Sequence, residues 1–131
     1  MEELSEEMAS AKAPAIIYRR HLERGKLGYQ RCAECSAAVF YPRVLCPVCG
    51  SGALEWRDSA GRGTVYATTA VHSRSRDPRN VVLVDLDEGF RMMSRVEGVP
   101  AEEVEVRTRV RFEVRQGEED EPVAVFVQEG S

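Results

Sequence analysis

Apolar and polar residues alternate with a period of two over most of the chain from Gly63 onward. This alternation is typical of strands that have one face in a core and the other in water. Turn-rich segments, including residues 73–80 and 116–122, separate the alternating stretches. The pattern predicts five strands, over residues 63–72, 81–86, 90–96, 106–115 and 123–128.

The fourth of these stretches shows the alternation most clearly. Val106, Val110 and Val114 fall on one face, and arginines occupy most of the other face. Residues 99–104 contain a proline followed by two glutamates, which indicates a short helical turn after the third strand. Five strands with a helical connection after the third is the order of elements in an OB-fold, a small, partly open Greek-key barrel. An SH3-like barrel also accommodates five strands.

A short amphipathic segment begins the ordered part of the chain. Pro14 suits the first turn of a helix, Ile17 and Leu22 lie on its apolar side, and Gly25 can end it. Residues 1–13 are acidic and rich in alanine, with few large apolar side chains. We therefore expect a disordered acidic tail before the helix.

Four cysteines form two C-x-x-C pairs, Cys32 with Cys35 and Cys46 with Cys49, with ten residues between the pairs. Each pair can bend into a tight knuckle, and the intervening hairpin can bring the knuckles together as a tetrahedral set of four sulfurs. Zinc fits this set, and four thiolates leave no open position for water, so we expect a structural Zn²⁺ ion. Sulfur ligands alone also admit iron. Because so short a ribbon buries little apolar surface, metal binding is expected to supply its folding free energy.

These patterns predict a mainly β protein with an N-terminal helix, a zinc ribbon and a five-stranded OB-fold barrel. The predicted parts are a disordered acidic tail over residues 1–13, a docking helix over 14–26, the zinc ribbon over 27–58 and the OB-fold over 59–131.

Length and charge limit the classes of protein to which this sequence can belong. A chain of 131 residues, 43% apolar and 31% charged, can bury one modest core and a small appended module. Uninterrupted apolar runs, such as residues 81–84, are far shorter than the roughly 20 residues that cross a bilayer. Since no basic or apolar leader opens the sequence, we expect a cytoplasmic protein. The net charge of −4 hides a basic middle and an acidic end, and the basic middle suits an anionic ligand or an acidic partner.

No recognisable catalytic set is present in the sequence. His21 and His72 fall in separate parts of the chain and belong to no metal-ligand or Ser-His motif. Phosphate-binding glycine loops, the nucleophile elbow and the H-E-x-x-H motif are all absent. We therefore expect a chain that catalyses no reaction by itself.

Single-stranded nucleic acid is an alternative ligand for a zinc-ribbon and OB-fold protein. Such binding requires a continuous basic groove with aromatic platforms. Arg107, Arg109, Arg111 and Arg115 on the fourth strand favour it, whereas the acidic residues 118–121 would repel phosphate. Nucleic-acid binding is therefore a weaker interpretation of these arginines than a solvated barrel face.

Several short segments resemble a family of acyl-CoA-associated proteins. They are Gly25-Lys26-Leu27, Gln30-Arg31-Cys32, Tyr41-Pro42-Arg43, Cys46-Pro47-Val48-Cys49, Trp56 and Gly61-Arg62-Gly63-Thr64-Val65-Tyr66. The likeness extends over about residues 15–128. Members of the family join an N-terminal helix, a rubredoxin-like zinc ribbon and a C-terminal OB-fold. They are non-catalytic partners of thiolase-fold enzymes, and some occur with hotdog-fold hydratases.

The resemblance implies an accessory subunit that binds a thiolase or a thiolase-like aldolase, alone or with a hydratase. Such a subunit helps to hold or channel an acyl-CoA substrate, for example in lipid or steroid side-chain degradation. Because CoA carries a pyrophosphate and a ribose phosphate, arginines of the ribbon and the first barrel loop are candidate CoA contacts. These are Arg43, Arg74, Arg76 and Arg79. Tyr18 and Leu22 on the helix are candidate partner contacts, and packing of the helix on its own ribbon is the alternative.

Overall fold

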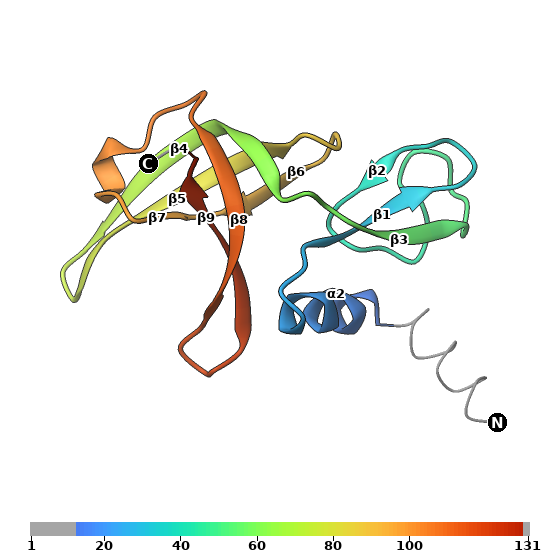
Figure 1. The fold of residues 1–131 in the computed structure, drawn as a ribbon, viewed down its shortest axis with the longest axis horizontal. Coiled ribbons are helices and arrows are strands. Elements are labelled where there is room, and N and C mark those ends of the chain that lie inside the picture. Colours follow the sequence, from blue (N-terminus) through green and yellow to red (C-terminus); the bar gives the residue numbers. More distant parts are fainter. Residues whose placement is uncertain (1–12, 130–131) are drawn as a thin grey trace. The chain divides into compact units, whose positions relative to one another are not determined.

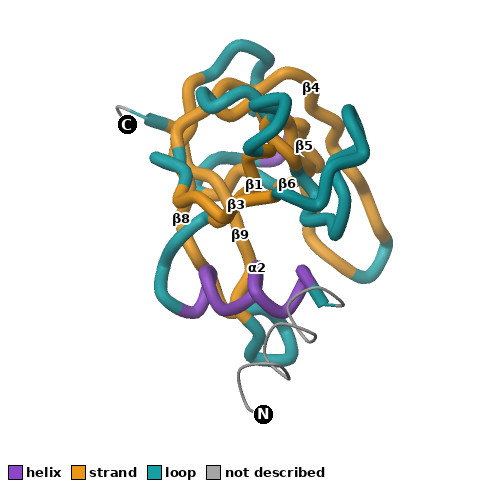
Figure 2. The backbone as a smooth tube through the Cα atoms, turned by 90° about the vertical axis from the view of Figure 1, so that its right-hand side faces the viewer, coloured by secondary structure: helices purple, strands orange, loops and turns teal. Residues whose placement is uncertain are grey.

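The computed structural model describes residues 13–129 and divides into two compact units, one ending at Ser59 and the other beginning at Ala60. Except for Ala13, the predicted acidic tail lies outside the described residues. Strands dominate both units, and α2 (Pro14–Glu23) is the only α-helix within residues 13–129 (Figure 2). This confirms the mainly β class. No helix in the described part of the chain has the length and apolar character needed to span a membrane.

The first unit contains α2 and a three-stranded antiparallel sheet in the order β2-β1-β3 (Figure 1). Its strands are β1 (Gly28–Cys32), β2 (Ala38–Val39) and β3 (Leu54–Asp58). β1 and β3 are paired along their whole lengths, from Gly28 opposite Asp58 to Cys32 opposite Leu54. This small sheet holds the ends of the loops that carry the cysteines.

Local sequence sets both ends of α2. Pro14 occupies the first turn, where its missing N–H has no consequence because that donor would have no partner within the helix. Gly25 has a φ of 75° just beyond the last turn, and its N–H donates to Leu22 O at 2.9 Å. Since glycine adopts a left-handed backbone without steric strain, the helix ends where the sequence predicts.

The second unit contains a six-stranded sheet in the order β6-β5-β4-β8-β9-β7. Its elements are β4 (Arg62–Ser73), β5 (Arg76–Leu86), β6 (Arg91–Ser94), β7 (Val96–Glu97), the 3-10 turn η1 (Ala101–Glu103), β8 (Arg109–Gln116) and β9 (Pro122–Gln128). β6 pairs antiparallel with β5, whereas β7 pairs parallel with β9. Because only Arg95 separates β6 from β7, this one segment pairs with both sides of the sheet and completes a partly open OB-fold barrel. The helical turn after the third predicted strand is also present, as η1.

Two glycines at the start of β4 allow close approach between strands. A side chain at Gly63 would place its Cβ 2.6 Å from Asp85 O on β5. Gly61 has a φ of 77°, and a Cβ at that position would lie 3.0 Å from Phe112 Cβ. The first barrel strand therefore requires the Gly-Arg-Gly sequence for packing.

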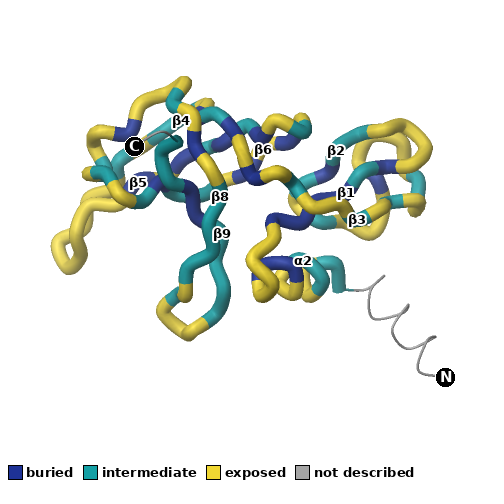
Figure 3. Tube along the Cα trace, in the orientation of Figure 1, coloured by how far each residue is buried: buried dark blue, intermediate teal, exposed yellow. Residues whose placement is uncertain are grey.

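The barrel core consists of aliphatic and aromatic side chains that alternate with exposed ones along the strands (Figure 3). Its least exposed members are Val65, Val82, Val84, Val110, Val125 and Phe126. The Phe126 ring also meets that of Phe112 edge-on, with 6.4 Å between centroids. Burying each such side chain contributes about 1.5–3 kcal/mol, so the alternation read from the sequence is the main source of barrel stability.

Two strands begin three or more residues away from their predicted starts, whereas the others begin within one residue of them. β5 begins at Arg76 rather than at residue 81, because Arg76 pairs with Ser73 across a short turn. The polar residues in between extend an exposed hairpin, since backbone pairing requires no apolar side chains. β8 begins at Arg109 rather than at residue 106, because the hydroxyl and the N–H of Thr108 both donate to Glu105 O and close a turn.

Candidate functional site

The four cysteine side chains converge in the first unit. All four sulfurs lie within 4.8 Å of one another, and the Cys32–Cys49 and Cys35–Cys46 Sγ pairs are each separated by 3.6 Å. Four ligands placed tetrahedrally at a Zn–S distance of about 2.3 Å lie about 3.8 Å apart, so this donor set fits a zinc ion. The cysteines are free thiols. The predicted metal-binding cluster is thus confirmed.

The two knuckles have the same backbone structure. Ser36 N–H donates to Cys32 O in the first, and Gly50 N–H donates to Cys46 O in the second, both at 2.9 Å. Ser36 and Gly50 both have a left-handed backbone, with φ of 65° and 78°. Glycine adopts this conformation freely, whereas for serine it is unfavourable by about 1–2 kcal/mol. The first knuckle therefore contains a strained residue where the second has none.

Backbone N–H groups stabilise thiolates at the two buried cysteines. The pKa of Cys46 falls to about 7, chiefly because the Cys49 N–H, and next the Val48 N–H, bond to its sulfur. The Cys35 N–H is the main reason that the pKa of Cys32 lies below its usual value. The pKa values of the other two cysteines are instead raised, that of Cys49 to about 12, because burial and the neighbouring sulfurs outweigh the backbone N–H bonds to them. Four thiolates at this site therefore depend on the charge of a bound metal ion.

Four sulfur ligands complete a tetrahedral shell, so a metal ion held here has no position left for a substrate. Its role is to join the two knuckles. Gln30, buried on β1, makes a second connection: its amide donates to Arg43 O at 2.8 Å and accepts from Arg43 N–H at 2.7 Å. This contact fixes the loop before the second knuckle. The sequence analysis did not identify it, although a polar residue within a buried strand was the available signal.

The candidate CoA-binding arginines do not form a single cluster within either unit. Arg43 belongs to the ribbon, and the other three belong to the β4–β5 hairpin of the barrel. Arg76 lies 3.6 Å from Glu118, whereas the guanidinium groups of Arg74 and Arg79 have no hydrogen-bond or ion-pair partner among residues 13–129. Arg76 and Arg79 lie in β5 rather than in the loop predicted over residues 73–80.

Tyr18 and Leu22 face the ribbon. Leu22 is 4% exposed, and the Tyr18 ring meets that of Phe40 edge-on with 5.5 Å between centroids. Burial also raises the pKa of Tyr18 to about 12. The structure therefore supports the alternative, in which this face of the helix packs on its own ribbon, and contact of Tyr18 and Leu22 with a partner stays a prediction.

Arginines on β8 are paired with carboxylates. Both Nη atoms of Arg109 donate to the Asp87 carboxylate at 2.8 Å. Glu113 lies within 3.1 Å of Arg111 and within 2.7 Å of Arg115. These pairs neutralise most of the basic face that favours nucleic-acid binding, so the structure weakens that hypothesis.

The two histidines have local partners. His21 stacks on Trp56, and His72 Nε2 lies 3.2 Å from Glu102 Oε1. Throughout the described residues, no fully buried side-chain nitrogen or oxygen lacks a hydrogen-bond partner. In the same range, the cysteine cluster is the only set of three or more candidate metal ligands.

The folds of the two units and the four-sulfur cluster define a zinc-ribbon and OB-fold protein, and comparison with known families agrees with this class. The family model described as "ChsH2, rubredoxin-like zinc ribbon domain" matches residues 19–55. The model described as "ChsH2, C-terminal OB-fold domain" matches residues 56–115.

Curated relatives identify the family. A "DUF35 domain-containing scaffold protein" of Methanocaldococcus jannaschii is 30% identical over 108 residues, which cover 77% of each protein. Another, of Methanothermobacter thermautotrophicus, is 26% identical and covers 77% of this chain and 81% of that protein. The chain belongs to the DUF35 family. A "Probable enoyl-CoA hydratase alpha subunit" of Thermomonospora curvata is 30% identical over 105 residues, but this chain spans only 33% of its length.

Solved structures support the same assignment. A chain in the structure of the Ltp2-ChsH2(DUF35) aldolase superposes with a TM-score of 0.76 at 26% identity and covers 86% of this chain and 92% of its own length. A DUF35 protein of unknown function from Sulfolobus solfataricus has a TM-score of 0.59 at 16% identity, covering 72% of this chain and 73% of its own. The latter likeness concerns the fold alone.

Proposed function

We propose that this chain is a non-catalytic accessory subunit of an acyl-CoA-processing complex, in which it binds a thiolase-fold enzyme. The observation that carries this proposal is the likeness, over 86% of the chain, to a chain of the Ltp2-ChsH2(DUF35) aldolase. The methanogen relatives are named scaffold proteins, which supports binding without catalysis. The Thermomonospora curvata relative, named for enoyl-CoA hydratase, supports a hydratase as a second partner.

The partner surface of this proposal lies on the ribbon, on the segment that leads into and forms the second knuckle. Val44, Leu45 and Val48 are large apolar residues in this segment, and Val48 is 72% exposed. Adjacent exposed apolar side chains of this kind mark protein interaction surfaces. The Gln30 amide and the metal knuckles hold the segment in one conformation, which lowers the entropy lost on binding.

The second part of the proposal is that this chain helps to hold or channel an acyl-CoA substrate. Lipid or steroid side-chain degradation would supply that substrate. Arg74 and Arg79 on the β4–β5 hairpin are exposed and have no ionic partner within the described residues. Their guanidinium groups can bind phosphate oxygens in pairs of hydrogen bonds without first breaking an ion pair. Arg43 on the ribbon and Arg76, which is paired with Glu118, are the secondary candidates.

Co-expression with a thiolase-fold enzyme encoded next to this chain tests the first part. Size-exclusion chromatography with light scattering is expected to show a stable hetero-oligomer. A double substitution of Leu45→Glu and Val48→Glu is expected to abolish it, because two carboxylates would be buried against an apolar surface. Ile16→Glu is the matched control, since Ile16 is 51% exposed on α2, outside this segment.

Elution of the wild-type chain as a free monomer beside such an enzyme would refute the proposal. If the double variant and the control lose assembly equally, the assignment of the partner surface to the ribbon is refuted, but the accessory role is not. For the CoA part, calorimetry of the purified complex with CoA is expected to show about tenfold weaker binding for Arg74→Ala. Arg62→Ala, at an exposed arginine paired with Glu129, serves as the control.

A further inference from the structure

The small sheet of the first unit has an open edge at β3. In the order β2-β1-β3, this strand lies on the outside and pairs with β1 alone (Figure 1). The side chains of Glu55, Arg57 and Asp58 on β3 are each more than half exposed. An exposed strand edge of this kind can pair with a strand of another chain through backbone hydrogen bonds.

The ladder between β1 and β3 determines which backbone groups of β3 face outward. In an antiparallel ladder, hydrogen-bonded and non-hydrogen-bonded residue pairs alternate. Just beyond the end of this ladder, Ser59 N–H donates to Leu27 O at 2.8 Å. Counting back by twos, Arg57 and Glu55 also direct their N–H and C=O groups toward β1. The N–H and C=O of Trp56, which lies between them, therefore point to the open edge.

The other end of the ladder gives the same assignment, because Ala33 N–H donates to Ala53 O at 2.8 Å. Gln30, the residue opposite Trp56, lies between β3 and β2 and pairs with Val39 on its other side. The backbone N–H and C=O of Trp56 have no hydrogen-bond partner within residues 13–129. They bind water in the isolated chain, and a second strand can replace that water.

Charges of opposite sign flank Trp56 on the exposed face of β3. Arg57 Nη2 lies 3.1 Å from Glu55 Oε1 within the same strand. When a second β3 pairs antiparallel with the two Trp56 residues opposite, Glu55 of each copy lies directly opposite Arg57 of the other. These are non-hydrogen-bonded pairs, whose Cα atoms are only about 4.5 Å apart, so the opposite charges stabilise the pairing. The two Trp56 residues exchange both of their backbone hydrogen bonds.

Among antiparallel registers, only this one satisfies both the backbone groups and the charges. Outward-facing groups belong to alternate residues, so any other register must be shifted by two residues. With Trp56 opposite Leu54, Glu55 would face Glu55 of the second copy. With Trp56 opposite Asp58, Arg57 would face Arg57. Since like charges directly opposite are destabilising, β3 is complementary to itself about Trp56, as a two-fold symmetric interface requires.

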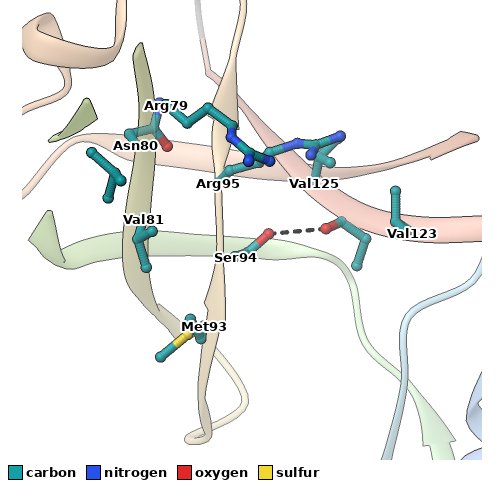
Figure 4. Close-up of a pocket in the computed structure, with 10 residues that line it drawn as sticks. Arg79, Asn80, Val81, Met93, Ser94, Arg95, Val123 and Val125 are labelled. Carbon is teal, nitrogen blue, oxygen red and sulfur yellow. Dashed lines mark hydrogen bonds between the residues drawn. The ribbon is translucent and has the colours of Figure 1, made fainter. Parts of the chain in front are cut away.

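The other outer strands of the described chain are less suited to pairing. β2 has only two residues, which is too short for a stable ladder with a second chain. In the barrel unit, the outer strands β6 and β7 are joined through Arg95. Ser94 Oγ also donates to Ala124 O at 3.0 Å, which ties the end of β6 to β9 (Figure 4).

We propose that two copies of this chain associate through β3 and form one antiparallel sheet in the order β2-β1-β3-β3-β1-β2. Reciprocal hydrogen bonds of Trp56 and two Glu55–Arg57 contacts hold the copies in register. Each strand contributes five residues, so the contact is smaller than a standard interface of about 1,600 Å². We therefore expect a weak dimer, with a dissociation constant in the micromolar range. This self-association is independent of the proposed thiolase-fold partner.

Analytical ultracentrifugation of the zinc-loaded full chain, from about 1 μM to about 1 mM, measures this dimer. Glu55→Arg alone and Arg57→Glu alone each place like charges opposite one another, so each should weaken association by at least about tenfold. When these two variants are mixed, they should associate with each other, because every opposed pair is then of opposite sign. The chain with both substitutions should dimerise like wild type for the same reason.

Amide hydrogen exchange identifies the edge directly. In the monomer, the outward N–H of Trp56 should exchange faster than the N–H groups of Glu55 and Arg57, and it should become protected as the concentration rises. Lys26→Glu and Glu34→Arg are the matched controls, since they change the charge by the same amount at exposed residues elsewhere in the first unit. Both should leave association unchanged.

A wild-type chain that stays monomeric at millimolar concentration overturns the proposal. A dimer in which the Trp56 amide stays unprotected also overturns it, and this readout does not depend on how well any variant folds. Failure of the two single variants to associate when mixed, with both zinc-loaded, has the same consequence. Protection of Trp56 only in the presence of a thiolase-fold enzyme would assign the edge to that enzyme instead. A dimer that forms no complex with such an enzyme supports pairing through β3 and refutes the accessory role.

Discussion

The imidazole ring of His21 lies stacked on the indole ring of Trp56, with 5.1 Å between centroids and 24° between planes. His21 Nδ1 is 2.9 Å from Ile17 O on the same helix, and its Nε2 is 3.6 Å from the Asp58 carboxylate. A Cβ at Gly28 would lie 2.7 Å from this ring, which explains why a glycine faces it. A single buried histidine thus joins α2 to β1 and β3.

Replacing His21 should therefore loosen the helix. His21→Ala removes the stacked ring and leaves a cavity, so we expect the free energy of unfolding of the first unit to fall by about 1–3 kcal/mol. Trp56 is the only tryptophan, so its fluorescence reports on this unit during denaturation. His72→Ala, whose side chain is 59% exposed, should change stability by less than about 0.5 kcal/mol. Equal effects of the two substitutions would contradict the role given to His21.

Loss of one metal ligand should unfold the ribbon and spare the barrel. Cys46→Ser is expected to reduce bound zinc and expose residues 13–59 to protease, because metal binding supplies the folding free energy of this unit. The barrel has its own core and should survive as a resistant fragment. Val48→Ala is the control, since it changes an exposed side chain between the ligands. Unchanged zinc content in Cys46→Ser, measured by atomic emission, would disprove the ligand assignment.

The left-handed residue of the second knuckle should favour glycine. Gly50→Ala is expected to destabilise the zinc-loaded ribbon by about 1–2 kcal/mol, since no neighbour clashes with the new Cβ and only the φ of 78° opposes it. Gly52→Ala places its Cβ 3.7 Å from Leu45 at a position without positive φ, so it should be neutral or slightly stabilising. Ser36→Gly should stabilise the first knuckle. Denaturation followed by Trp56 fluorescence measures all three, and a reversed order for Gly50 and Gly52 would exclude the backbone explanation.

Acid should weaken the barrel through Asp87. Hydrogen bonding from Arg109 holds the pKa of this carboxylate below its usual value. The unfolded chain then binds a proton at higher pH than the folded one, so this stabilisation is present above the unfolded pKa and is lost as the pH falls. Asp87→Asn should flatten the decline in barrel stability between about pH 5 and pH 3, whereas Glu119→Gln at the hairpin tip should not. Amide exchange of the barrel at several pH values measures this, and identical slopes in wild type and Asp87→Asn would contradict it.

Sequence alone determined the features that depend on local spacing. Two cysteines three positions apart bring their sulfurs to one point whatever surrounds them, so Cys32, Cys35, Cys46 and Cys49 could be assigned without a structure. The alternation of apolar and polar residues likewise predicts which face of each strand lies in the core, because successive side chains of a strand point to opposite faces of the sheet. The ends of α2 could also be predicted, because Pro14 and Gly25 act through their own backbone properties.

Tertiary structure decided which exposed charged groups remain available to bind a ligand or partner. The reason is that their ion-pair partners lie far away in the sequence. Arg109 meets Asp87 across the sheet, whereas Arg79 meets no carboxylate within the described residues, and composition does not distinguish the two. Leu22 faces the ribbon because the turn at Gly25 directs the helix back onto β1. The barrel is partly open because one strand leaves β5 for β9 at Arg95, a change of hydrogen-bonding partner that only the folded chain defines.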